Sequence, residues 1–439
     1  MITRTIRQAA RNLSRSASVG IFIIAGMLLT ATTAKAAIHY VATNGSDASP
    51  GTIDQPFRTI KKGTGALNSG DTLYIRGGTY DEIIENWDLP AGSPEMHTTI
   101  AGYENENPVI RCTDCGPYAV VTLGQSYTTV QGFTIDAINT PVDGVCVLLA
   151  ANILFAEMTC LNAARDGVRV IGENTTIRDS HVKDCGRIQT DLADTKGLGI
   201  QANSDGGSNT SNLLIERNFI EGCRAGGIAV HQQSQTTNAV VRENIIQNFG
   251  SRSTWGQREG ASPQLGHGII FGHGSYYYAY NNLVINAGRS SGNGYLNRCF
   301  LAWGGGDGRP HGSFFWFLNN TCHDADVGIQ TWDETNNVTA ANNIFSNVDY
   351  IELLNGANNS NSSYVTNPMF VNAPAGDFRL QADSPGVNQG VNLSPIVTTD
   401  ITGASRDGSY DIGAYESDGV VPSLSPPEVI SDTTAVSEQ

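Results

Sequence analysis

The chain has 439 residues, of which 49 are glycine, and its 42 acidic residues outnumber its 26 lysines and arginines, for a formal net charge of −16 at pH 7. So acidic a protein lacks the basic surface that phosphates attract, which argues against a nucleic-acid partner. Abundant glycine with few charged residues disfavours long helices and favours many short strands joined by tight turns.

The first 36 residues have the pattern of a secretory signal peptide. Four arginines and no acidic residue precede an apolar run at 19–29 and the small-residue triplet Ala34-Lys35-Ala36. This run is shorter than the ~20 residues that span a bilayer, and no other stretch is as long and as apolar. We therefore expect cleavage after Ala36 and a monomeric mature protein, secreted or periplasmic, without a membrane span.

The region that follows contains a repeat. A short strand with alternating apolar residues, a polar turn and a second short strand recur at intervals of 23 to 38 residues, which predicts a basic coil of about 23 residues with loops inserted into some turns. The turns end at Ser180, Asn218, Asn244, Asn282, Asn320 and Asn343.

Each coil also contains a third strand that begins with glycine. These glycines are Gly167, Gly197, Gly227, Gly268 and Gly328. Three short strands per coil can bury alternate side chains only against the coils above and below, so the sequence predicts an all-β, right-handed parallel β-helix. The repeated asparagines predict an asparagine ladder inside one turn, with apolar Phe133 and Met158 at the same position in earlier coils.

The coil register also bears on the eight cysteines. Cys185 and Cys223 each lie five residues after a ladder position, so we expect them to be neighbours on adjacent coils and to form a disulfide. Cys160 and Cys322 fall at inward positions and are predicted as core residues. Cys112 and Cys115 can close a small loop.

Both ends of the repeat region carry familiar motifs: YVATNGSD at 40–47, QPFRTI at 55–60 and GDTLYIRGGTY at 70–80, then NPMF at 367–370, GDFRL at 376–380 and DIGAYE at 411–416. They resemble the N-terminal cap and the terminal coil segment of secreted pectate-lyase-like β-helix proteins. The resemblance implies one solenoid domain at 37–416, with the cap and first coils at 37–110 and the terminal coil segment at 365–416. The remaining residues, 417–439, have the composition of a disordered tail.

That superfamily includes lyases of uronate polysaccharides, glycosidases, epimerases and proteins without assigned activity, so the resemblance implies a fold and does not select a reaction. It also implies a substrate groove along the glycine-opened strands. Long insertions at 186–195, 250–266 and 288–297 all precede those strands. Loops gathered on one side of a solenoid usually form its binding face, so pattern and resemblance agree.

Aligning the glycine-opened strands, with Cys299 as the equivalent of the glycine in one coil, gives a column at the residue before each glycine. Its members are Asp143, Asp166, Lys196, Gly226, His267, Arg298 and Val327. A uronate lyase must neutralise the substrate carboxylate, remove the C5 proton and protonate the leaving oxygen. In this hypothesis Asp143 and Asp166 bind calcium, Lys196 is the base, and His267 or Arg298 assists.

A second outward line lies four residues after the same glycines, with Ile171, Gln201, His231, Gly272, Trp303 and Trp332. Tryptophans beside a groove can stack on sugar rings, or can pack beneath the long loops. Arginines near this face can pair with uronate carboxylates through a bidentate guanidinium. The predicted substrate-binding residues are Arg169, His231, Trp303, Trp332, Arg258 and Arg309.

The leading hypothesis is therefore a lyase acting on an anionic polysaccharide. A glycoside hydrolase is the second, because NSDG at 203–206 and GHGS at 272–275 resemble fragments of the polygalacturonase pattern and offer Asp205 as an acid and His273 as a helper. The paired aspartates expected between them are missing, and hydrolysis needs two carboxyls. A non-catalytic carbohydrate-binding adhesin is the third, and an epimerase shares the first step of the lyase.

Overall fold

The computed structural model describes residues 35–85, 89–113, 119–139, 145–187, 197–202, 210–250, 266–288, 296–303, 312–332, 335–353, 358–360, 367–406 and 408–417. The chain divides into two compact units, Met1–Ala36 and Ala37–Gln439, and the second holds every element described below. Within the described residues, no helix has the length and apolar character needed to cross a membrane.

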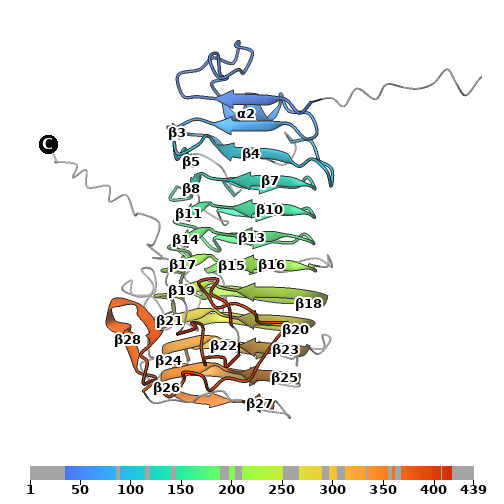
Figure 1. Ribbon diagram of the computed structural model, residues 1–439. Helices are drawn as coiled ribbons and strands as arrows, with labels where there is room; N and C mark the ends of the chain where they lie inside the picture. The colour runs from blue at the N-terminus through green and yellow to red at the C-terminus, as the bar shows by residue number, and fades with distance from the viewer. Residues whose placement is uncertain are drawn as a thin grey trace, which may run out of the picture. The chain divides into compact units, whose positions relative to one another are not determined.

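The second unit is a parallel β-helix, in which strands from successive coils pair in parallel and stack along one axis (Figure 1). Each full coil contributes one strand to each of three faces, here called sheets 1, 2 and 3 in chain order. A short helix, α2 (Ile60–Thr64), lies among the first strands, and the Thr59 hydroxyl caps it by accepting a hydrogen bond from the Lys62 backbone N–H.

Sheet 1 consists of β1 (Ile38–Val41), β2 (Thr72–Ile75), β4 (Thr98–Gly102), β7 (Thr128–Gln131), β10 (Ile153–Ala156), β13 (Thr176–Arg178), β16 (Leu213–Glu216), the later parts of β18 (Gly226–Arg242) and β20 (His267–Tyr280), β23 (Ser313–Leu318), β25 (Asn336–Ala341) and β27 (Asn358–Ser360). Sheet 2 consists of β3 (Thr79–Tyr80), β5 (Val109–Arg111), β8 (Thr134–Asp136), β11 (Thr159–Leu161), β14 (His181–Lys183), β17 (Phe219–Glu221), β19 (Ile245–Gln247), β21 (Leu283–Gly288) and the first parts of β24 (Thr321–Trp332) and β26 (Ile344–Glu352). Sheet 3 consists of β6 (Val121–Leu123), β9 (Cys146–Leu148), β12 (Val168–Val170), β15 (Leu198–Ala202), the first parts of β18 and β20, β22 (Arg298–Trp303), and the later parts of β24 and β26.

The core runs along the inside of the coils as stacked apolar columns. In sheet 3, one column places large aliphatic and aromatic side chains directly opposite one another from coil to coil, and each is fully buried: Ile200, Ile228, Ile269, Phe300 and Ile329. Because successive side chains of a strand point to opposite faces, the short alternating strands bury one set and leave the other for the surface.

The predicted asparagine ladder is present in the turn between sheets 1 and 2. Each ladder oxygen accepts a hydrogen bond from the backbone N–H of the preceding ladder residue, at 3.0–3.1 Å in every step from Ser180 to Asn343. Phe133 and Met158 are buried in earlier coils, as predicted. The residue before each ladder position has a positive φ, as in Asn281 at 53°, which turns the chain tightly into sheet 2.

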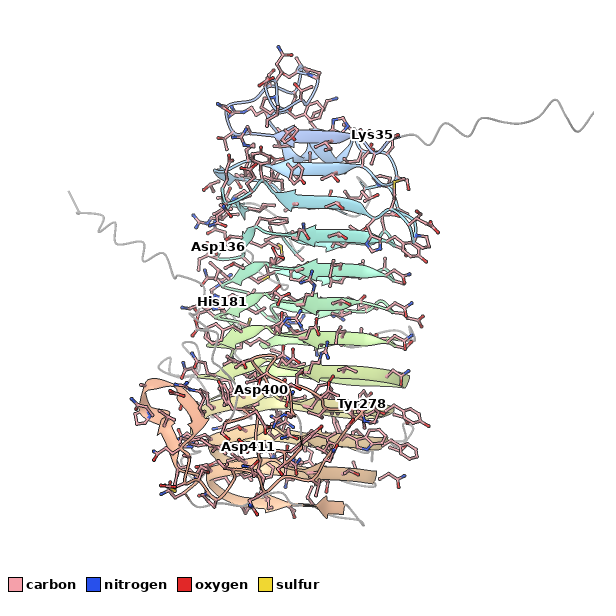
Figure 2. The ribbon with its side chains drawn as sticks, viewed as in Figure 1. Lys35, Asp136, His181, Tyr278, Asp400 and Asp411 are labelled. Carbon is pink, nitrogen blue, oxygen red and sulfur yellow. A yellow bond between two sulfur atoms is a disulfide. The ribbon has the colours of Figure 1, made fainter. Side chains whose placement is uncertain are left out.

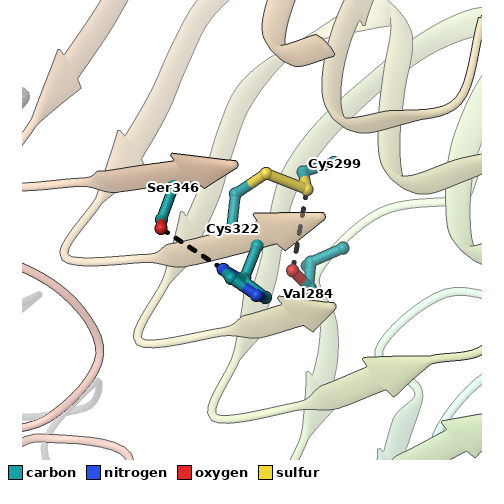
Figure 3. The surroundings of a disulfide bond; sticks show 5 residues. Val284, Cys299, Cys322 and Ser346 are labelled. Carbon is teal, nitrogen blue, oxygen red and sulfur yellow. Dashed lines mark hydrogen bonds between the residues drawn. A yellow bond between two sulfur atoms is a disulfide. The ribbon is translucent and has the colours of Figure 1, made fainter. Parts of the chain in front are cut away.

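The cysteine pairing differs from the prediction. Cys185 and Cys223 are neighbours but remain free thiols, and a disulfide instead joins Cys299 to Cys322 (Figure 3). The glycine column points inward, since a Cβ placed on Gly268 would lie 2.3 Å from a methyl of Val284, so Cys299 in that column meets inward Cys322. Cys160 is a buried free thiol, as predicted.

Cys112 is disulfide-bonded, while Cys115, its predicted partner, lies outside the described residues.

The segment 367–417 packs against the ladder turn instead of adding a coil. It begins with an antiparallel pair, β28 (Phe370–Asn372) and β29 (Asp377–Leu380), joined by the 3₁₀ turn η3 (Ala373–Ala375). Asn319 donates its amide to the carbonyls of Asp411 and Gly413, and buried Arg406 binds Glu416 at 2.6 Å. Asp411 and Asp400 accordingly lie over the C-terminal coils (Figure 2).

Candidate functional site

The outer face of sheet 3 carries the predicted functional residues in three columns. The first contains Leu198, Gly226, His267, Arg298 and Val327, in register from coil to coil. The second contains Arg169, Gln201, Ala229, Ile270, Leu301 and Gln330, and the third contains His231, Gly272, Trp303 and Trp332. The face therefore brings together two of the three predicted catalytic residues, His267 and Arg298, on adjacent strands.

The register of β15 differs from the predicted one by two residues. Val168 pairs with Ile200 and Leu198 pairs with Gly226, so the glycine that aligns with Gly167 and Gly227 is Gly199 and not Gly197. The first column therefore has Leu198 where the sequence alignment placed Lys196, and Gln201 moves into the second column. Lys196 itself lies outside the described residues, as do Asp143, Arg258, Arg309 and Asp205.

His267 is a buried, neutral imidazole. Its side chain is 5% exposed, and burial, reinforced by the nearby charge of Arg298, lowers its pKa to about 3. Its ring meets Trp332 edge to face at 6.5 Å between centroids. Among the described residues no group lies within hydrogen-bonding distance of Nδ1, so this nitrogen is available to a ligand that reaches it.

Arg298 is held in place by a chain of polar contacts. Its Nε donates to Gln330, whose amide donates in turn to Glu352, and its Nη1 donates to the Leu296 carbonyl at 2.9 Å. The guanidinium also lies 4.6 Å from the ring centre of Trp332. Burial lowers the pKa of Arg298, but an arginine starts so high that it stays cationic near neutral pH.

The two tryptophans border an apolar strip. Trp303 and Trp332 are partly buried against a small cluster formed by Leu198, Ala225, Ala229, Ile270 and Leu301. Their rings are 6.5 Å apart and nearly perpendicular, at 84°. Because the rings are not coplanar, a sugar can stack on one of them at a time. The side chain of His231 in the same column lies outside the described residues.

Asp166 braces two coils. It is 6% exposed, and its Oδ1 accepts hydrogen bonds from the backbone N–H groups of Gly197 and Leu198, at 2.8 and 2.9 Å. Burial raises its pKa against the opposing effect of these bonds. The part of the chain that the structure describes contains no cluster of three or more acidic, histidine or cysteine side chains suited to a metal, so calcium binding stays a prediction.

Part of the β-helix is similar to a known protein family. Residues 39–225 match the family model described as the Pel9A-like right-handed β-helix region. This part, less than half of the chain, is similar to the Pel9A-like right-handed β-helices. The predicted fold, a right-handed parallel β-helix of the pectate-lyase-like superfamily, is thereby confirmed.

Curated relatives match only a short stretch. An uncharacterised protein of Bacillus subtilis, YwoF, is 41% identical over 71 residues, or 16% of this chain and 15% of its own. Pectate lyase PEL9 of Emericella nidulans is 35% identical over 75 residues, or 17% of this chain and 18% of its own. The chain thus covers less than a fifth of either relative.

Solved structures share the fold at low identity. Pectate lyase Pel9A has a TM-score of 0.57 at 15% identity, with 86% of this chain and 96% of that one covered. A rhamnogalacturonan lyase has a TM-score of 0.50 at 17% identity, with coverage of 79% and 97%. The lacto-N-biosidase of Eubacterium ramulus has a TM-score of 0.51 at 15% identity, with coverage of 74% and 68%.

The β-helix also contains a residue that the sequence patterns did not single out. Arg224 lies two residues before Gly226, at the start of sheet 3 in a coil without an inserted loop, and its side chain is 1% exposed. Its only visible signal in the sequence is the motif Cys223-Arg-Ala-Gly226, in which a charged residue follows an inward cysteine. His273, the helper of the hydrolase hypothesis, is fully buried against Trp303, 4.9 Å between ring centres.

Proposed function

We propose that the protein is a polysaccharide lyase that cleaves a uronic-acid-containing polysaccharide by β-elimination. The observation that carries the proposal is the position of two buried side chains at the same register in adjacent coils of sheet 3. They are the guanidinium of Arg298 and the neutral imidazole of His267. Pectate lyase Pel9A and a rhamnogalacturonan lyase share the fold, which is supporting evidence for the substrate class.

The chemistry assigns each group one task. The guanidinium of Arg298 pairs with the uronate carboxylate, which makes the C5 proton more acidic. A base removes that proton, the C4–O4 bond breaks, and the leaving oxygen takes up a proton, so that the new chain end carries a C4=C5 double bond. Lys196 is the proposed base, and the proton that it removes passes to the leaving oxygen. Neutral His267 is the proposed hydrogen-bond donor to that oxygen.

Calcium is the proposed cofactor of the predicted Asp143–Asp166 pair. Asp143 lies outside the described residues, and the Oδ1 atom of Asp166 already accepts two backbone N–H groups, which leaves Oδ2 of Asp166 for a metal. No step above depends on calcium.

The test is to incubate the mature protein, from Ala37, with polygalacturonate, alginate and glycosaminoglycans, each with calcium or with a chelator. Ultraviolet absorbance reports the unsaturated ends that elimination produces. New reducing ends without absorbance would identify a hydrolase instead. Binding without either signal would leave a carbohydrate-binding solenoid.

In that assay Arg298→Gln is expected to lower the rate of absorbance increase by roughly 10- to 100-fold, because the variant loses the charge that stabilises the carbanion-like transition state. Lys196→Ala is expected to remove the signal. Arg379→Gln, which breaks a half-exposed ion pair with Asp377 on the terminal segment, is the control and should leave the rate unchanged. An Arg298→Gln variant with the wild-type rate would refute the assignment of this residue.

A further inference from the structure

Arg224 is a buried cation that forms no salt bridge with the residues that the structure describes. Within the described parts of the chain, no acceptor lies within hydrogen-bonding distance of its Nε or Nη2, although its side chain is 1% exposed. No acidic side chain forms a salt bridge with it there, and burial alone lowers its pKa. Nε and Nη2 carry three of the five N–H donors of the guanidinium, and burying these three unpaired is unfavourable.

The surrounding backbone makes room for this arginine. Gly186 and Gly197 approach each other and the stem of Arg224. A Cβ on Gly186 would lie 2.8 Å from the Arg224 Cβ, and one on Gly197 would lie 3.3 Å from it. Both glycines have positive φ, 90° and 101°. A larger side chain at either position would displace Arg224, so these glycines accommodate it.

The neighbouring Arg187 has the contacts expected of an arginine with a structural role. Arg187, next to Gly186 in the chain, donates to the backbone carbonyls of Asn162 and Ala137 and so ties two coils together. Arg224 makes no such contacts with the described residues through Nε and Nη2, although it is more deeply buried than Arg187. The unpaired edge of a guanidinium matches a carboxylate in a bidentate way.

We propose that Arg224 is a specificity-determining residue that binds a substrate carboxylate on sheet 3, ahead of His267 and Arg298. The proposal rests on the proposed function for the identity of the anion, a uronate. Gly226, two residues after Arg224, pairs with His267, which pairs with Arg298, so the coils of Arg224 and Arg298 are two steps of ~4.8 Å apart. A sugar chain running across the coils can therefore place one carboxylate at Arg224 and another at Arg298.

Binding is the first test. Trimers of galacturonate and of mannuronate, each compared with its fully methyl-esterified form, are titrated into the mature wild-type protein and into Arg224→Gln by calorimetry. We expect the wild type to bind one acid trimer at least ~10-fold more tightly than its ester, and Arg224→Gln to lose that preference, because a charge-assisted hydrogen-bond pair contributes about a 10- to 100-fold difference in affinity. An unchanged preference in the variant, or none in the wild type, would overturn the proposal.

Thermal unfolding separates this role from a structural one. Removing an unpaired buried cation should stabilise the fold, so Arg224→Met is expected to raise the melting temperature by ~1–3 °C while removing acid-trimer binding. Arg187→Gln, the matched control, should lower the melting temperature and keep the binding preference. A lower melting temperature in Arg224→Met would contradict the proposal, since it would mean that the arginine supports the fold.

The cleavage assay keeps this inference distinct from the proposed function. Preference for the acid trimer without unsaturated products would refute the lyase and leave the role of Arg224 intact. Conversely, elimination that persists in Arg224→Gln with an unchanged acid-over-ester preference would refute the role of Arg224 and leave the lyase intact.

Discussion

Asn282→Ala is expected to lower the free energy of unfolding by roughly 3–6 kcal/mol, because it removes the central step of a fully buried ladder. Asn282 donates to the Val241 and Tyr280 carbonyls and to the side-chain oxygen of Asn320, and its own oxygen accepts the backbone N–H and the amide of Asn244. Alanine leaves several of these groups buried without partners, and each costs ~1–3 kcal/mol.

The measurement is guanidinium unfolding of the mature protein followed by circular dichroism. Gln247→Ala is the matched control, since Gln247 also belongs to a coil-to-coil contact but donates only to the partly buried carboxylate of Glu221. Gln247→Ala should lower the free energy of unfolding by less than ~1 kcal/mol, because water can replace the missing hydrogen-bond partner of Glu221. Equal losses in the two variants would mean that burial of the ladder adds nothing to the strength of its hydrogen bonds.

The ladder was predictable because each position imposes the same demand. One side chain must accept the N–H of one coil and donate to a carbonyl within the narrow turn, and asparagine meets both needs. The demand repeats with every coil, so it leaves one residue type at regular intervals in the sequence. The three-faced fold followed from that repeat and from the alternation of apolar residues.

The register of β15 was not predictable from the same pattern. The segment Gly197-Leu-Gly-Ile200 contains two glycines that can each open the strand, and hydrophobic alternation does not separate them. Only pairing with β12 and β18 selects Gly199. The predicted disulfide between Cys185 and Cys223 was wrong for a related reason. A shared position on adjacent coils predicts that two cysteines are neighbours, but it does not predict whether they form a bond.

The candidate site was predictable in part. The coil alignment placed His267 beside Arg298 and Trp303 beside Trp332, since β20, β22 and β24 keep a simple register. It could not reveal Arg224, because whether an arginine is buried and unpaired depends on how neighbouring turns close around it. The sequence shows only a charged residue in a turn, which is more often a solvated side chain.

His267 predicts a pH dependence of stability with a definite sign. Its pKa in the folded protein, about 3, lies below its ordinary value of 6.5, so only the unfolded chain binds a proton in this interval. The contribution of neutral His267 to the free energy of unfolding is therefore complete above pH 6.5 and is lost as the pH falls towards 3. Its main cause is burial, to which the charge of Arg298 on β22 adds, and Trp332 covers the ring.

Other groups titrate in the same range, so a variant must isolate the effect. Burial raises the pKa of Glu416 to about 7, which makes stability fall as the pH rises, opposite in sign to His267. We therefore expect the unfolding free energy of wild type minus that of His267→Gln to decrease by about 2 kcal/mol between pH 7 and pH 5, at about 1.4 kcal/mol per unit below 6.5. His323→Gln, whose parent side chain is less buried and has a smaller downward pKa shift, is the control and should show a smaller decrease. A difference that stays constant with pH would mean that His267 takes up a proton in the folded protein, and the neutral imidazole assigned to the site would have to be abandoned.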